Sequence, residues 1–244
     1  MADPKAILLE EYHFPLINQY GHPVVGWKPT TKGFGGLCNP RGYAMPRVVI
    51  VDAKGQPLYD QPLIVENAGS IVIAQFGEKV ALIQNYRMVG NRILPNAGPA
   101  YIKRLQDDGL WDKLVASLGR WCWEAPRGLA PLEQGDEELE RFIIRTAKLE
   151  AAEEAGIKID DARIVGMANL NSTFFPHAQY VVHAIITSVG EKNTEDLELI
   201  QGMQLFTLKQ LRDLNQAGEF DDGATLAALA LCGLHLGGSD EQPD

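Results

Sequence analysis

The sequence predicts an α/β protein, and three observations support this fold class. Two apolar segments flank Gly77-Glu78 between Gly69 and Arg87, which is typical of a β-hairpin. Apolar side chains recur at helical spacing from Leu139 onward, and Gly156 is expected to end that helix. The chain has no internal repeat, so we expect strands and helices to share one core.

The first 67 residues are expected to form a small β subdomain. Turns rich in Gly and Pro separate the strand-like stretches Arg47 to Asp52 and Pro62 to Glu66. Trp27, Phe34 and Tyr43 are candidates for stacking on a base, although aromatic residues in a small sheet are more often core.

The main domain is expected over residues 68–237, followed by a disordered tail at 238–244. Residues 91–120 are a helical insertion with a break near Gly109, and we interpret it as a lid, a specificity element or an oligomer contact. ARIVGMANL and QYVVHAIITS predict strands. TLKQLRDLNQ predicts a helix capped by Thr207, and GATLAALAL predicts the final helix.

Composition limits the class of protein. The 244 residues, 45% of them hydrophobic, with a mean hydropathy of −0.12, describe an ordinary globular chain. No apolar run reaches the roughly 20 residues that span a bilayer, and early charges argue against a secretory signal, so we expect a cytoplasmic protein without a membrane partner.

Charge and cysteine content narrow the choice of partners. The net charge of −10 argues against a long nucleic acid as partner, but a bound metal would still allow a small phosphorylated ligand. Cys38, Cys122 and Cys232 are widely spaced and indicate neither a disulfide framework nor a zinc site.

Three glutamates at helical spacing are the strongest functional signal. Glu150, Glu153 and Glu154 fall at i, i+3 and i+4, so they share one arc of the helix. An acidic solvated face is the ordinary interpretation of such a pattern. Here Arg141, Arg145 and Lys148 take the opposite side, so the acids face inward, and a hard cation such as Mg²⁺ is the natural compensation.

This helix resembles the second half of the Nudix box, G-x5-E-x7-R-E-U-x-E-E-x-G-U, in which U is a bulky aliphatic residue. Glu150 matches the E of R-E, Glu153 and Glu154 match E-E, and Gly156-Ile157 match G-U. The upstream WEAPRG, Trp123 to Gly128, is similar to the E-x-P-x-G segment of ADP-ribose pyrophosphatases, which makes Gly128 the opening glycine.

The chain departs from the box at several positions. Leu149 stands where the family has arginine, and Ala151 stands at an aliphatic position. The segment between Gly128 and Glu150 is longer than the pattern, so the position of the first box glutamate falls on Arg141. Either Asp136 or Glu137 replaces that glutamate, or nothing does.

The resemblance implies a Nudix-type mixed β-sheet sandwiched between helices, an α+β arrangement, and a homodimer that exchanges contacts through the N-terminal region. It implies Mg²⁺- or Mn²⁺-dependent hydrolysis of the diphosphate of ADP-ribose or a related nucleoside-diphosphate sugar. The implied metal ligands are Glu150, Glu153, Glu154 and the carbonyl of Gly128; the implied substrate-binding residues are Arg87, Glu124 and Arg127; the catalytic candidates are Glu153, Glu154, Glu195 and Glu198.

Several alternatives remain open at this point. Arg87 ends QNYR and is equally compatible with a plain surface ion pair, while Glu195 and Glu198 are equally compatible with solvated loop acids. His177 is more often surface decoration than a catalytic group. A Nudix-fold module that binds an ADP-ribose-like ligand without cleaving it is the main competing function, and hydrolysis of another diphosphate is a third.

Overall fold

The computed structural model describes residues 47–66, 69–129, 137–171, 173–191 and 199–237, together with four short strands nearer the N-terminus. Those strands are β1 (Lys5–Glu10), β2 (Leu16–Ile17), β3 (Pro23–Val24) and β4 (Tyr43–Ala44). The predictions for Trp27, Phe34, Cys38, Asp136, Glu195, Glu198 and the tail lie outside the described residues.

The strands that the structure describes in the N-terminal region form small antiparallel sheets. β1 pairs with β5 (Arg47–Val51), which pairs with β6 (Pro57–Pro62), and β4 pairs with β7 (Val65–Glu66). The expected strand over Pro62 to Glu66 is interrupted, because β6 ends at Pro62 and β7 begins only at Val65. Proline cannot donate to a sheet ladder, which is consistent with a strand ending there.

A seven-stranded mixed sheet forms the centre of the main domain. It consists of β8 (Gly69–Phe76), β9 (Lys79–Arg87), β10 (Arg120–Glu124), β11 (Arg127–Leu129), β12 (Ile157–Ala168), β13 (Gln179–Val189) and β14 (Ile200–Thr207). β8 runs parallel to β13, and the other pairs are antiparallel.

The hairpin of β8 and β9 opens into a fork. These strands pair only next to their turn, at Gln75–Val80 and Phe76–Lys79. Beyond that point the two strands diverge, and β10 pairs with the inner edge of β9 while β11 pairs with the inner edge of β8. On the outer edges, β14 pairs with β9 and β13 pairs with β8. Residues 120–129, which include WEAPRG, therefore fill the fork between the two central strands.

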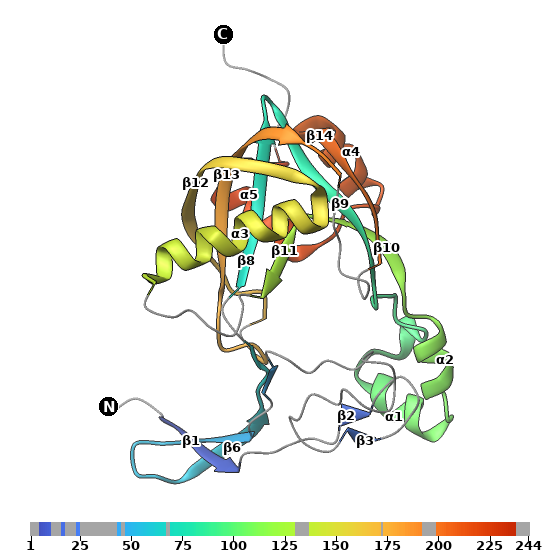
Figure 1. The fold of residues 1–244 in the computed structure, drawn as a ribbon. Helices are drawn as coiled ribbons and strands as arrows, with labels where there is room; N and C mark the ends of the chain where they lie inside the picture. The colour runs from blue at the N-terminus through green and yellow to red at the C-terminus, as the bar shows by residue number, and fades with distance from the viewer. Residues whose placement is uncertain are drawn as a thin grey trace.

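Helices cover both faces of this sheet (Figure 1). α3 (Leu139–Ala155) crosses one face, and α4 (Leu208–Gln216) and α5 (Gly223–Leu231) lie on the other. Neighbouring residues of β8 serve two cores, since Val72 and Ala74 pack toward α3 whereas Ile71 and Ile73 pack toward α4 and α5. Burial on both faces explains why this strand is apolar without alternation.

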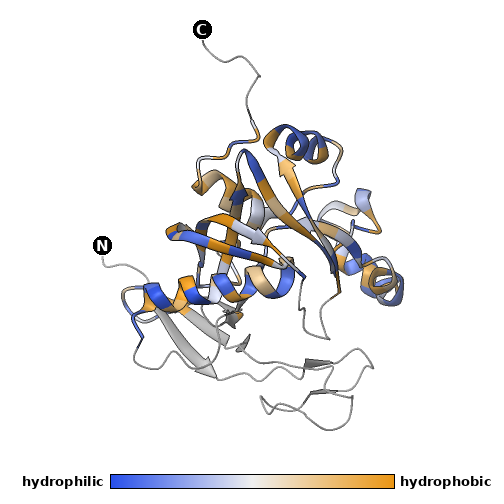
Figure 2. Ribbon diagram, turned by 45° about the horizontal axis from the view of Figure 1, so that its top comes forward, coloured by the Kyte–Doolittle hydropathy of each residue, from blue (hydrophilic) through white to orange (hydrophobic). Residues whose placement is uncertain are grey.

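The helix boundaries follow from local sequence. α3 ends at Gly156, whose φ of 65° lies in the left-handed region that glycine adopts without strain. Thr207 caps α4 through a reciprocal capping box with Gln210, as the sequence predicted. Hydrophobic and hydrophilic residues alternate along α3 (Figure 2), which places one side of this helix against the sheet.

The segment between β9 and β10 is helical. It contains η1 (Pro95–Ala100), α1 (Tyr101–Asp107) and α2 (Trp111–Ala116), with Gly109 at the break between α1 and α2. α1 and α2 lie beyond the ends of β9 and β10, away from the central sheet (Figure 1). Among the described residues, none of the helices has the length and apolar character needed to cross a membrane.

Candidate active site

The three glutamates of α3 lie where the helix passes the fork. Glu154 is 1% exposed, while Glu150 and Glu153 are half-buried. The neighbouring Ala151 and Ala155 are buried, so small side chains let this turn approach the sheet closely. The predicted inward direction of the arc is therefore correct for Glu154.

Two of these carboxylates contact the main chain of β11. Glu154 Oε2 accepts a hydrogen bond from the Arg127 N–H at 2.8 Å. A Cβ placed on Gly128 would lie 2.0 Å from Glu150 Oε1 and 2.4 Å from its Oε2. The Glu150 carboxylate therefore occupies the space that any side chain at position 128 would need, and only glycine fits there unless this carboxylate moves.

An ion network around the buried Glu124 fills the fork. Glu124 is fully buried, and its carboxylate accepts hydrogen bonds from Arg87 Nε at 3.0 Å, from Arg127 Nη2 at 3.0 Å and from Asn85 Nδ2 at 3.0 Å. Burial lowers the pKa of the Arg87 guanidinium, but the hydrogen bond to Glu124 and the charges of Glu124, Glu154 and Asp222 outweigh this and raise it. The Arg87 guanidinium therefore stays charged beside Glu154 of α3.

The position of Glu124 makes it a structural partner of the two arginines. Removing one member of a buried, hydrogen-bonded ion pair typically costs about 3–5 kcal/mol, because it leaves an uncompensated charge. Arg87 keeps 38% of its side-chain surface exposed, so this guanidinium can reach a ligand while Glu124 holds it from behind.

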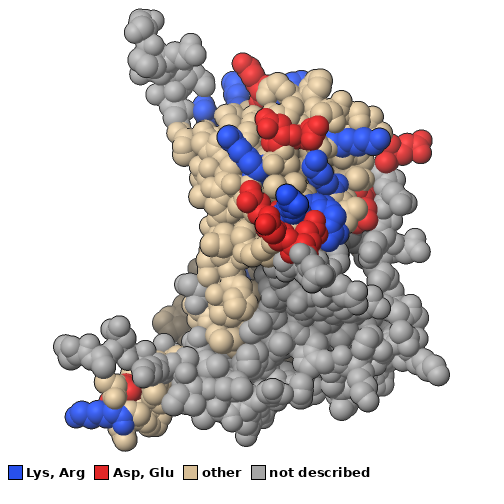
Figure 3. All heavy atoms as spheres, turned by 60° about the vertical axis from the view of Figure 1, so that its left-hand side comes forward, with Lys and Arg blue, Asp and Glu red and all other residues tan. Residues whose placement is uncertain are grey.

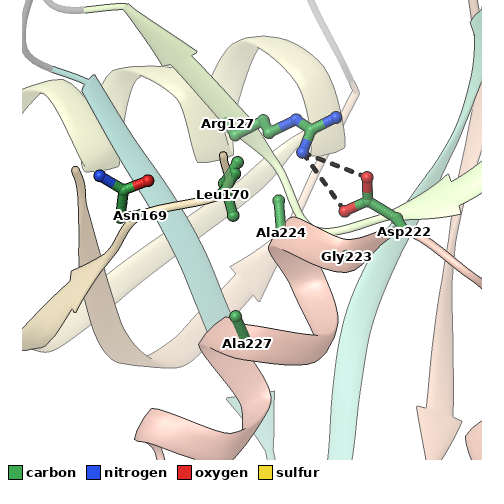
Figure 4. Close-up of a pocket in the computed structure, with 7 residues that line it drawn as sticks. All are labelled: Arg127, Asn169, Leu170, Asp222, Gly223, Ala224 and Ala227. Atoms are coloured by element: carbon green, nitrogen blue, oxygen red, sulfur yellow. Dashed lines mark hydrogen bonds and ion pairs between the residues drawn. The ribbon is translucent and has the colours of Figure 1, made fainter. Parts of the chain in front are cut away.

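Arg127 connects the fork to a pocket of about 430 Å³ at the start of α5 (Figure 4). Its guanidinium pairs with Asp222 across 3.2 Å, and both side chains line the pocket. Asn169 and Leu170 form the facing wall, and Ala224 and Ala227 lie along α5. This volume falls within the range of small-molecule sites, about 300–1,000 Å³.

The donors of α3 suit a magnesium-type ion but do not form a closed cage. Within the described ranges, no three Asp, Glu, His or Cys side chains are gathered closely enough to hold a metal by themselves. Mg²⁺ ordinarily takes one or two carboxylates, several waters and substrate phosphates at about 2.0–2.1 Å. Glu150 lies against Gly128, which has no side chain, and Glu154 lies against the main chain of the preceding residue, so two carboxylates are available for that open type of site.

The structure shows the surroundings of two residues at which the chain departs from the Nudix box, Glu137 and Leu149. Glu137 pairs with Arg145 across 2.9 Å, on the side of α3 turned away from Glu150 and Glu154. Leu149 is 42% exposed. Glu137, one of the two acids considered for the first glutamate of the box, is thus paired with Arg145 on the outer side of the helix. Asp136, the other candidate, lies outside the described residues.

Asp222, Thr225 and Asn85 belong to this site although the sequence did not single them out. Asp222 is the N-cap of α5 and accepts a hydrogen bond from Thr225 N at 2.8 Å. The D-x-x-T spacing in DDGAT signals that cap, but nothing in the sequence shows that Arg127 reaches it. His177 lies in an exposed bend.

Two titrating groups lie away from the site. Burial lowers the pKa of His183 and the charge of Arg163 lowers it further, while Asp161 acts in the opposite direction. Burial raises the pKa of Cys232 to about 11. Cys122 is also buried, in β10.

Comparison with known proteins identifies the fold. A solved structure described as an ADP compounds hydrolase superposes with a TM-score of 0.53 at 14% sequence identity, covering 80% of this chain and 87% of that one. The chain has a Nudix-type fold. A Nudix hydrolase from Nitrosomonas europaea gives a TM-score of 0.44 at 13% identity, covering 68% of this chain and 88% of that one. No protein-family model and no curated protein matches the chain.

The expected mixed sheet between helices is thereby confirmed. Lys and Arg are interleaved with Asp and Glu on the described part of the face shown in Figure 3, which gives no broad basic surface there.

Proposed function

We propose that this protein is a Nudix hydrolase that cleaves the diphosphate of ADP-ribose or a related nucleoside-diphosphate sugar with Mg²⁺ or Mn²⁺. The observation that carries the proposal is the convergence of Glu150 and Glu154 of α3 on the main chain at Arg127 and Gly128. Box glutamates and the E-x-P-x-G glycine thus meet in space although 22 residues separate Gly128 from Glu150. The ADP compounds hydrolase of similar fold supports this substrate class.

The chain's own residues divide the work of binding and orientation. Glu150, Glu153, Glu154 and the carbonyl of Gly128 would hold the divalent ion, which when bound neutralises a diphosphate and lowers the pKa of a coordinated water. Arg87 and Arg127 offer fixed positive charge to the substrate phosphates, and Glu124 orients both guanidinium groups.

Proton transfer requires one further carboxylate. A general base must lie within hydrogen-bond reach of the attacking water. Glu195 and Glu198 are the proposed candidates, with Glu153 as the alternative because its half-buried carboxylate shares the arc of Glu154. Single substitutions of these three residues, with kcat measured against pH, would identify the base as the position whose loss removes the fall of kcat at low pH, because a carboxylate base must be deprotonated to accept the proton.

A second candidate function is binding without turnover. The exposed Leu149 in place of an arginine favours it, and so does the pairing of Glu137 to Arg145 on the outer side of α3, because neither matches the box pattern. Retention of three acids on one arc opposes it, because like charges at this spacing cost about 0.2–0.5 kcal/mol per pair unless a cation compensates them.

One experiment separates the two functions. Wild type and Glu154→Gln are incubated with a panel of nucleoside-diphosphate sugars, with and without Mg²⁺, and nucleoside monophosphate release is measured. We expect metal-dependent release that falls by about 10²-fold or more in the variant. Ligand binding without release by either protein would favour the binding module and contradict the enzyme. The homodimer and the cytoplasmic location remain predictions, and light scattering tests the former.

A further inference from the structure

The first turn of α5 makes hydrogen bonds beyond those that a helix cap requires. Asp222 Oδ1 accepts from Thr225 N at 2.8 Å and from Thr225 Oγ1 at 2.7 Å, which closes the cap. The same Thr225 Oγ1 also accepts the N–H of Ala125 at 2.8 Å. Ala125 and Thr225 are both fully buried, so this bond joins α5 to the β10–β11 connection in the interior.

Asp222 adds a second link to that connection. Its carboxylate pairs with Arg127 Nη1 across 3.2 Å. The main-chain N–H of Arg127 in turn donates a hydrogen bond to Glu154 Oε2 at 2.8 Å. The two links hold residues 125 and 127 on either side of Pro126, whose carbonyl accepts the N–H of Val72 at 2.9 Å. The segment that touches Glu150 and Glu154 is therefore fixed from the α5 side of the sheet.

The cap of α4 provides a direct comparison. Thr207 Oγ1 accepts from Gln210 N at 3.2 Å, and Gln210 Oε1 accepts from Thr207 N at 2.9 Å. These bonds return to the helix's own first turn, as capping boxes ordinarily do. The cap of α5 instead shares its hydroxyl with a strand connection that lies against the glutamates of α3.

We propose that Asp222 and Thr225 are positioning residues for the metal site. They hold residues 125–128 so that the Arg127 N–H orients Glu154 and the bare Cα of Gly128 leaves room for Glu150. The inference deepens the proposed function and rests on it. Groups that orient metal-binding carboxylates commonly change metal affinity or activity by 10–100-fold when lost.

Metal binding by the full-length protein tests the inference without relying on turnover. The dissociation constant of Mn²⁺ is measured from the loss of the free-ion EPR signal for wild type, Thr225→Val and Thr225→Ser. Valine keeps the buried shape but leaves the Ala125 N–H without its acceptor, whereas serine restores the hydroxyl. We expect about 10-fold weaker binding for valine and less than about 3-fold change for serine. Thr207→Val is the matched control and should bind Mn²⁺ like wild type.

Each outcome has a distinct meaning. A lower melting temperature for Thr225→Val with unchanged Mn²⁺ affinity would show a purely structural cap and overturn the inference, while the proposed function would stand. Wild type that binds no Mn²⁺ and cleaves no substrate would overturn the proposed function itself. If Thr225→Val does not fold, Asp222→Asn takes its place, since asparagine keeps the cap acceptor but weakens the pairing with Arg127; wild-type affinity in that variant would refute the inference.

Discussion

Replacing Gly128 by alanine should displace one carboxylate and little else. The new Cβ would lie 2.0 Å from Glu150 Oε1 and 2.2 Å from its Cδ, whereas ordinary contacts begin near 3.4 Å. The nearest oxygen must therefore retreat by 3.4 − 2.0 = 1.4 Å. Metal–ligand distances tolerate about ±0.2 Å, so Glu150 would leave the coordination shell.

The cost in stability should be small by comparison. The clashing atoms are the far end of a flexible side chain, and a rotamer shift costs about 0.5–1.5 kcal/mol. For a chain of this size that corresponds to a fall of roughly 1–6 °C in melting temperature. We expect Mn²⁺ affinity and kcat to fall about 10- to 100-fold, close to the effect of Glu150→Ala.

Calorimetric Mn²⁺ titration, thermal melts and a double-mutant cycle check this reasoning. Gly202→Ala is the control, because a Cβ there has nothing within 4 Å. In the Glu150→Ala background, Gly128→Ala should have no further effect, since the two changes act on one carboxylate. Additive losses, or Mn²⁺ affinity unchanged in Gly128→Ala, would refute the assignment of Glu150 as a ligand.

Three further predictions concern single positions. Leu149→Arg should change kcat by less than about 2-fold, because Glu137 already pairs with Arg145; a gain of about 10-fold in the hydrolysis assay would contradict this account of the loop. The pKa of His183 is lowered in the fold, so the unfolded chain takes up the proton first and stability should fall as pH drops below about 6.5. His183→Gln should flatten that decline in urea titrations at pH 5–7, and an unchanged slope would argue against it. Cys232, with a pKa of about 11, should resist iodoacetamide at pH 8 in the folded protein, and rapid labelling of its peptide, measured by mass spectrometry, would contradict the raised pKa.

Much of the fold follows from local sequence because each signal has a local physical cause. The helix of the three glutamates ends at Gly156 because the chain there needs a positive φ, and Thr207 starts α4 because it caps an exposed N–H. The β8–β9 hairpin follows from two apolar runs around Gly77, whose φ is also positive. The strand expected over Pro62 to Glu66 is interrupted after Pro62. Its apolar residues favour a strand, but proline has no N–H to donate to a neighbouring strand.

The site was less accessible to sequence reasoning because its decisive contacts are long-range. Glu124 was expected to bind substrate, but the fork buries it between Arg87 and Arg127, and only the pairing of β10 with β9 brings those groups together. Asp222 meets Arg127 from 95 residues away. A cap signal identifies the start of a helix, but it contains no information about which distant backbone the cap will touch.

The most direct test of the central claim is a crystal structure of the protein with Mn²⁺ and a non-hydrolysable ADP-ribose analogue. We expect anomalous density within coordination distance of Glu150 and Glu154, beside the Gly128 carbonyl, with the diphosphate of the analogue completing the shell. The account would be contradicted by a structure with no anomalous peak near Gly128 and with the analogue bound elsewhere or absent. In that structure the carboxylates of α3 would contact only solvent or other protein groups.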